Sequence, residues 1–190
     1  MKTFMEDMHE PRQDTLIQKL NTASFFPERF SEDVWIGGYR GLYRLTKDSL
    51  YYIDVDTLHR TYIREIKQAD DSTIWVLGYF EGLHQLKKGP EGNYIYQGLK
   101  FAASDCEALE LVGDYAWIWT RKGLFKFNLK NGRHSQYQKG LANSDITALK
   151  YFQNDLWVGT IEGLFVLPMK AGSIDDPDDV TPNLKIKHIA

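Results

Sequence analysis

The sequence repeats one short phrase four times, and this repeat constrains the fold more than any other feature. Its tryptophans are Trp35, Trp75, Trp117 and Trp157, separated by 40, 42 and 40 residues. The Gly-Leu pairs that follow them begin at Gly41, Gly82, Gly123 and Gly163, with spacings of 41, 41 and 40 residues. Because two independent markers keep the same period, the chain is predicted to consist of repeated structural units.

Each unit has the pattern of several short β-strands. In the fourth unit the apolar and β-branched stretch 145–152 precedes a turn, and LWVGT and LFVL then form two strands around the turn IEG. Asn131-Gly132 in the third unit is a strong hairpin signal that leads into a fourth strand. Four antiparallel strands in roughly 40 residues have the size of a propeller blade. The sequence therefore predicts an all-β protein, a β-propeller of about four four-stranded antiparallel blades.

The period divides the chain into an N-terminal lead, residues 1–22, and four blades. The blades are expected at about 23–60, 61–103, 104–143 and 144–190, with 184–190 as the last strand of the fourth blade. An open stack would expose two apolar end faces of roughly 300 Å² each, as large as the biggest apolar patch on a typical monomer. Three arrangements avoid this exposure: a small closed ring, association with another copy, or a partial propeller with further blades in the same chain.

The repeated tryptophans and glycines have structural interpretations. Each sheet is expected to lie between neighbouring sheets, so the four indole rings are predicted to fill the layers between blades. A turn between the second and third strands needs a positive φ, which a residue with a Cβ atom adopts only at a cost of about 1–2 kcal/mol. The four glycines are therefore predicted to be turn residues.

The repeated phrase resembles a known family. LWVGTIEGLFVL, preceded by SDITALKYFQND, is similar to the two-component regulator propeller repeat, whose pattern is an Ile-led strand, a turn, "lWvGT" and "GLyrl". The resemblance covers about residues 23–167; the second unit has one extra residue, and in the third unit Trp119 stands where the pattern has Gly159. It implies the periplasmic sensor region of a bacterial hybrid histidine kinase, with seven-blade rings and carbohydrate sensing upstream of a phosphorelay. The repeat itself carries no ligand-binding signature.

Composition and charge exclude several classes of partner. The net charge is −3 with no basic run, so no nucleic-acid interface is predicted. No stretch approaches the roughly 20 apolar residues of a membrane span, and the acidic N-terminus lacks the apolar core of a signal peptide. The chain as written is expected in the cytoplasm, and in the periplasm if it is part of a longer sensor.

No catalytic or metal motif is evident. The five histidines are scattered singly, and there is no H-E-x-x-H, G-x-S-x-G, P-loop or G-x-G-x-x-G pattern. The single cysteine excludes an internal disulfide and a multi-cysteine metal site. We therefore expect no catalysis in this chain, no cofactor and no metal; a kinase would lie elsewhere in a full-length protein.

What remains is a binding surface on one rim of the propeller, where the loops between second and third strands meet the loops between blades. Aromatic rings beside charged groups can stack on sugars and bind hydroxyls or carboxylates. The candidate ligand contacts on this rim are Tyr39, Arg40, Tyr79, Glu81, Trp119, Arg121, Lys122 and Glu162. Trp119 is included because a large ring there replaces a small residue.

Three functions are compatible with the sequence. The first is a non-catalytic ligand-sensing propeller segment that detects an oligosaccharide or another small molecule. The second is a scaffold for protein–protein interaction, in which the rim or the end faces bind a partner. The third, a propeller lyase or hydrolase, requires converging acid, base or metal groups that the sequence does not show.

Overall fold

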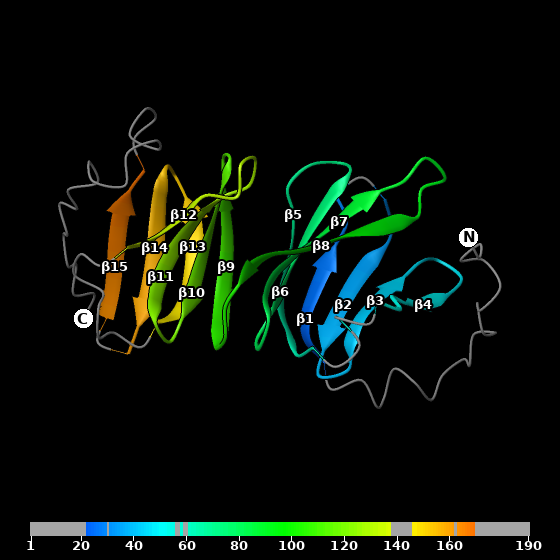
Figure 1. Ribbon diagram of the computed structural model, residues 1–190, viewed down its shortest axis with the longest axis horizontal. Helices are drawn as coiled ribbons and strands as arrows, with labels where there is room; N and C mark the ends of the chain where they lie inside the picture. Colours follow the sequence, from blue (N-terminus) through cyan, green and yellow to red (C-terminus); the bar gives the residue numbers. More distant parts are fainter. Residues whose placement is uncertain are drawn as a thin grey trace.

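The computed structural model describes residues 22–29, 31–55, 58, 61–137, 146–161 and 163–169, which form antiparallel strands in four sheets (Figure 1). Blade 1 contains β1 (Thr22–Pro27), β2 (Val34–Gly38), β3 (Gly41–Leu45) and β4 (Leu50–Tyr52). Blade 2 contains β5 (Ile63–Gln68), β6 (Thr73–Gly78), β7 (Gly82–Lys88) and β8 (Tyr94–Ala102). Blade 3 contains β9 (Cys106–Val112), β10 (Tyr115–Thr120), β11 (Gly123–Asn128) and β12 (His134–Tyr137). Blade 4 contains β13 (Ile146–Phe152), β14 (Asp155–Thr160) and β15 (Gly163–Pro168).

Each sheet is a meander, since its strands pair in the order in which they occur along the chain. The prediction of an all-β propeller with about four blades is confirmed. Blades 1 to 3 have four strands, and blade 4 has three in the described part of the chain. The fourth strand predicted at 184–190 lies outside the described residues, as does most of the predicted N-terminal lead.

The blades form an open array. The first strand of each blade, called here the inner strand, contacts the preceding blade: β5 packs beside β1 and β2, β9 beside β5 and β6, and β13 beside β9. No comparable contact joins β13 to β1 among the described strands. In Figure 1, blade 1 and blade 4 lie at opposite ends of the long axis. Among the described residues, each end blade therefore has one sheet face without a neighbouring blade.

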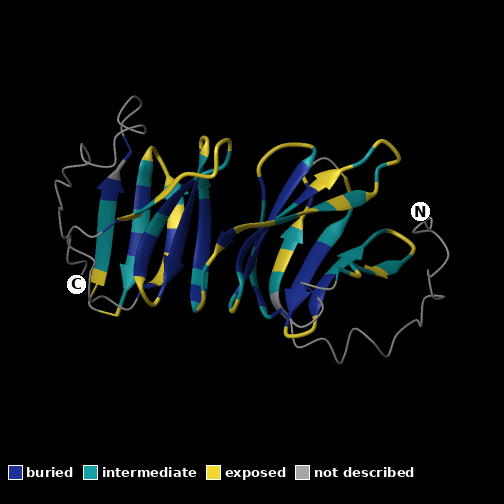
Figure 2. Cartoon of the chain, in the orientation of Figure 1, coloured by how far each residue is buried: buried dark blue, intermediate teal, exposed yellow. Residues whose placement is uncertain are grey.

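Apolar layers between the blades form the core. Three clusters of buried side chains contain Trp35, Trp75 and Trp117, which are 0%, 2% and 3% exposed. Figure 2 shows burial concentrated in strands such as β9, whereas β8 is exposed along much of its length. Trp157 differs from the other three, because it is only half-buried on the open face of blade 4. The expectation that all four indoles fill interblade layers therefore remains a prediction for Trp157, because no described blade follows blade 4.

The glycines of the four repeats turn the chain between the second and third strands. Their φ angles are 97° at Gly41, 113° at Gly82, 122° at Gly123 and 144° at Gly163. These values lie in the region that L side chains rarely adopt. In three blades two residues separate the strands, whereas Tyr79, Phe80 and Glu81 separate β6 from β7. The extra residue of the second unit therefore lengthens this one turn.

Polar contacts between inner strands tie successive blades together. The carboxylate of Glu110 on β9 accepts hydrogen bonds from Lys67 Nζ on β5 at 2.8 Å and from Lys150 Nζ on β13 at 3.1 Å. It also accepts from the backbone N–H of Tyr151 at 3.2 Å. Glu110 is buried, and these hydrogen bonds compensate its carboxylate for the loss of water. Burial alone would raise the pKa of Glu110, but the hydrogen bonds and the charge of Lys67 hold it below the ordinary value. One side chain thus links blades 2, 3 and 4.

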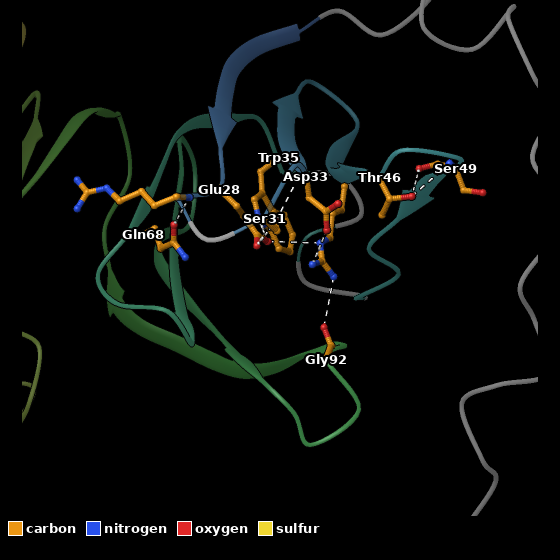
Figure 3. A network of polar contacts seen from close by, with 10 residues as sticks. Glu28, Ser31, Asp33, Trp35, Thr46, Ser49, Gln68 and Gly92 are labelled. Carbon is orange, nitrogen blue, oxygen red and sulfur yellow. Dashed lines mark hydrogen bonds and ion pairs between the residues drawn. The ribbon is translucent and has the colours of Figure 1, made fainter.

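A second network joins blades 1 and 2 just past the C-terminal end of β1 (Figure 3). The buried carboxylate of Glu28 accepts from Trp35 Nε1 at 2.7 Å and forms an ion pair with Arg44 Nε at 3.4 Å. Arg44 also pairs with Asp33 at 2.6 Å and donates to the carbonyl of Gly92 in the turn after β7 at 3.4 Å. The network fixes the indole of Trp35 in its layer, and its role is structural.

Candidate functional site

A row of four aromatic rings crosses the junction between blades 1 and 2 on the predicted rim. We call this row the aromatic rim; it consists of Tyr39, Tyr62, Tyr79 and Phe80. The rings of Tyr39 and Tyr62 are stacked, with centroids 3.9 Å apart and an interplanar angle of 6°. Tyr62 and Tyr79 follow at 6.0 Å, and Tyr79 meets Phe80 edge to face at 4.8 Å. Tyr39 and Phe80 are 55% and 61% exposed, whereas Tyr62 and Tyr79 are half-buried, so the two ends of the row are open to solvent.

Backbone hydrogen bonds fix the centre of this row. The Tyr79 N–H donates to the Tyr62 carbonyl at 2.8 Å, and the Tyr79 carbonyl accepts from the Cys106 N–H at 3.0 Å. Tyr62 directly precedes β5, and Cys106 begins β9. The turn between β6 and β7 is thereby attached to the entry segments of blades 2 and 3. Rings held on a rigid backbone lose little conformational freedom when a ligand binds.

Arg64 supplies a charged group next to the rings. Its Nη1 donates to the Tyr62 hydroxyl at 3.1 Å, and its guanidinium lies over the Tyr62 ring at 5.5 Å from the centroid. Its Nη2 pairs with Glu107 on β9 at 2.6 Å. The Nε–H is buried and has no hydrogen-bond partner in the structure. The site therefore combines flat apolar faces with an oriented cation, a carboxylate and a buried donor.

The hydroxyls of Tyr39 and Tyr79 remain protonated at neutral pH. A hydrogen bond with Tyr62 raises the pKa of Tyr39. Burial, and then a hydrogen bond with Asp105, raise the pKa of Tyr79. Neutral hydroxyls both donate and accept hydrogen bonds, which suits polyhydroxylated ligands.

Some predicted rim residues lie elsewhere. Trp119 is 5% exposed, because alternation along β10 directs it, like Trp117, into the layer against blade 4. Its interpretation as an exposed ligand-binding ring is wrong. Glu81 is half-buried: its carboxyl group is hydrogen-bonded to Thr61, and burial raises its pKa. Glu162 lies outside the described residues.

The remaining predicted residues are exposed in the turns of blades 1 and 3. Arg121 lies close enough to Tyr79 to act on its pKa, and its N–H donates to the Asp105 carbonyl at 3.2 Å. Arg40 and Lys122 are exposed, and among the described residues no hydrogen bond or ion pair joins their side chains to the aromatic rim. The structure therefore brings together Tyr39, Tyr79 and Arg121, from three successive blades.

Four residues of the site were not predicted: Tyr62, Phe80, Arg64 and Glu107. The sequence could have indicated Tyr62, because the segment before each inner strand lies on the same rim as the turns between second and third strands. Phe80 could also have been identified, because the extra residue of the second unit lengthens the turn in which Phe80 lies. The Arg64–Glu107 pair depends on the spacing of inner strands, which a single sequence does not reveal.

The described residues contain no group of three or more His, Cys, Asp or Glu side chains arranged to hold a metal ion. Within the same residues, no helix is long and apolar enough to cross a membrane. Next to the aromatic rim, Arg64 and Glu107 are joined in an ion pair, and Asp105 and Arg121 lie close to Tyr79.

No protein-family model and no curated protein sequence matches the chain. Solved structures with the same fold include the extracellular domain of the hybrid two-component system BT4673 from B. thetaiotaomicron. That domain has 20% identity and a TM-score of 0.64 over 77% of this chain and 20% of the other. The extracellular domain of BT3049 from the same organism has 14% identity and a TM-score of 0.57, covering 78% of this chain and 23% of the other.

Virginiamycin B lyase from Staphylococcus aureus has 11% identity and a TM-score of 0.60, over 80% of this chain and 53% of the enzyme. At these identities the likeness establishes the propeller fold alone. This chain spans about a fifth of the length of the two extracellular sensor domains.

Proposed function

We propose that this chain is a non-catalytic, ligand-sensing propeller segment of the kind found in extracellular domains of hybrid two-component systems. The aromatic rim is the observation that carries the proposal. A row of aromatic rings with two solvent-exposed ends, beside an arginine and a carboxylate, matches the chemistry of an oligosaccharide, whose sugar faces stack on aromatic rings while its hydroxyls form hydrogen bonds. As part of the same proposal, this segment is located in the periplasm.

The position of the aromatic rim suggests how binding would be sensed. Tyr39 belongs to blade 1, whereas Tyr62, Tyr79 and Phe80 belong to blade 2 and to the segment that leads into it. Arg64 and Glu107 extend the site to blade 3. A ligand that contacts all of these groups favours one relative position of three blades, and a shift of this kind can be passed to an adjoining domain.

A panel of oligosaccharides tested by isothermal titration calorimetry examines the proposal. We expect Tyr39→Ala or Phe80→Ala to weaken binding of the recognised saccharide about 2–13-fold, because each loses one stacking ring worth about 0.5–1.5 kcal/mol. Tyr51→Ala is the matched control, since Tyr51 is an exposed tyrosine on β4, outside the aromatic rim.

Two results would contradict the proposal: no saccharide of the panel binds, or Tyr51→Ala weakens binding as much as Tyr39→Ala. The exposed rings also favour a second function, a surface for protein–protein interaction, because aromatic residues are enriched in such interfaces. Binding of a folded protein partner that is lost in Tyr39→Ala, without any saccharide binding, would support this alternative.

A further inference from the structure

Each completed junction between blades contains the same pair of side chains. The tryptophan of one blade shares an apolar cluster with a residue from the inner strand of the next blade. The three pairs are Trp35 with Ile66, Trp75 with Leu109, and Trp117 with Leu149. All six side chains are buried. The junction is thus a repeated contact with a donor face, which carries the tryptophan, and an acceptor face, which carries the inner-strand residue.

Blade 1 has an acceptor face that no described blade covers. In every blade the acceptor residue pairs with the residue that follows the tryptophan: Ile66 with Val76, Leu109 with Ile118, and Leu149 with Val158. In blade 1 the residue after Trp35 is Ile36, and its partner on β1 is Phe25. Phe25 is 63% exposed, whereas its three counterparts are buried. It is a large apolar side chain at a position that elsewhere packs against an indole.

Blade 4 has the matching donor face. Trp157 pairs with Lys150 on β13 and with Val166 on β15, so these three side chains lie on the same side of the sheet. That side is opposite to the one packed against blade 3, where Leu149, Leu156 and Leu167 are buried. Trp157 and Val166 are half-buried, and Phe152 at the end of β13 is 56% exposed. Ile36, which lies beside Phe25 on the same side of the sheet, is 4% exposed, so the exposed apolar positions of the two end faces are Phe25 on blade 1 and Trp157, Val166 and Phe152 on blade 4, none of which a described blade covers.

We propose that these two faces bind each other between two copies of this chain. Trp157 of each copy packs against Phe25 of the other, so the pair forms two equivalent junctions and a ring with two-fold symmetry. Both junctions repeat the contact that already joins blades 1 to 2, 2 to 3 and 3 to 4. The partner is thus a second copy of this chain, and the surface on it is the face of blade 1 that contains Phe25.

The area of the faces favours a closed pair over a single contact. One junction between two sheet faces of roughly 300 Å² removes roughly 600 Å² of surface in total, which is below the range of stable interfaces. Two junctions remove roughly 1,200 Å², which reaches the lower limit of that range. An open head-to-tail chain would still expose an apolar face at each end. Closure with two copies leaves neither face exposed.

Sedimentation equilibrium on the full chain tests the proposal. We expect a mass twice the 22.0 kDa of one chain at micromolar concentration. Phe25→Glu and Trp157→Lys should each reduce the mass to that of one chain, because each places a charge in both junctions. Val166→Lys is a second donor-face variant that leaves the indole in place. Phe80→Glu is the matched control, since Phe80 has nearly the same exposure as Phe25 but lies in the turn between β6 and β7.

Mixing the two charged variants makes the test specific for this geometry. In a pair made of one Phe25→Glu copy and one Trp157→Lys copy, the first junction contains both substitutions, so a carboxylate faces an ammonium group. The second junction contains neither substitution. We expect the mixture to regain the double mass. A single-chain mass for the unmodified protein, a double mass that survives both substitutions, a mixture that stays single, or an assembly that lengthens with concentration would each overturn the proposal. Circular dichroism of each variant confirms that its strands are intact.

Discussion

The imidazole of His84 illustrates how a buried polar residue is accommodated in a layer between blades. His84 lies on β7, is 1% exposed, and shares a hydrogen bond of 2.9 Å between its Nδ1 and the Tyr96 hydroxyl. Its Nε2 is buried without a hydrogen-bond partner. Because the surroundings supply no partner for a second N–H, the neutral form is favoured. Burial lowers the pKa of His84 to about 4.

This pKa predicts a loss of stability in mild acid. The unfolded chain binds a proton at His84 near pH 6.5 and the folded chain only near pH 4, so the contribution is fully present above pH 6.5 and is lost as the pH falls toward 4. The loss amounts to about 3 kcal/mol of unfolding free energy. His84→Gln should remove this part of the pH dependence in urea unfolding monitored by circular dichroism. Burial raises the pKa of nearby Glu81, so Glu81 stabilises the folded chain as the pH falls, opposite to His84. The effect of His84 is therefore measured as the difference between the unmodified protein and His84→Gln at each pH.

An unchanged difference in unfolding free energy between the histidine and glutamine proteins from pH 7 to pH 4 would contradict this prediction. His134 on β12 provides the control, because it is exposed.

At the scale of the element, the hairpin of second and third strands is the part of the fold that the sequence predicts best. Its tryptophan and its glycine mark the period, and both have strict physical requirements: a filled layer and a positive φ. Side-chain direction at the rim is harder to predict. Trp119 lies next to an exposed turn in sequence but points into the layer against blade 4, and only the register of β10 decides this.

Glycine substitutions separate backbone strain from steric clash in these hairpins. A Cβ atom at Gly82 would lie 2.0 Å from the Phe101 carbonyl oxygen, whereas one at Gly163 would have no neighbour within 4 Å. Both residues have positive φ. We therefore expect Gly163→Ala to cost about 1–2 kcal/mol of unfolding free energy from strain alone. Gly82→Ala should cost distinctly more, because the backbone carbonyl must also move. Chemical denaturation of the two variants checks the order, and equal losses would contradict it.

At the scale of the whole molecule, the stability of each blade in an open array depends on its contacts with the blades next to it. Blades 2 and 3 are covered on both faces, whereas blades 1 and 4 are each covered on one. The hydrogen-bonded Glu110 links blades 2, 3 and 4, and Glu28 and Arg44 link blade 1 to blade 2. The sequence predicts the number of blades but not these links, since they require residues 40 or more positions apart to meet.

The position of a tryptophan in this array should decide its contribution to stability. Trp75→Ala empties a layer that blades 2 and 3 enclose on both sides, so we expect a loss of about 3–5 kcal/mol of unfolding free energy. Trp157→Ala removes a ring that is half-exposed already, so the expected loss is about 1–2 kcal/mol at protein concentrations low enough to keep single chains. Urea unfolding of both variants provides the comparison. Equal losses would mean that Trp157 is as well covered as Trp75, which would contradict an open array. A smaller loss for Trp157→Ala that grows with protein concentration would instead indicate that a second copy covers this face.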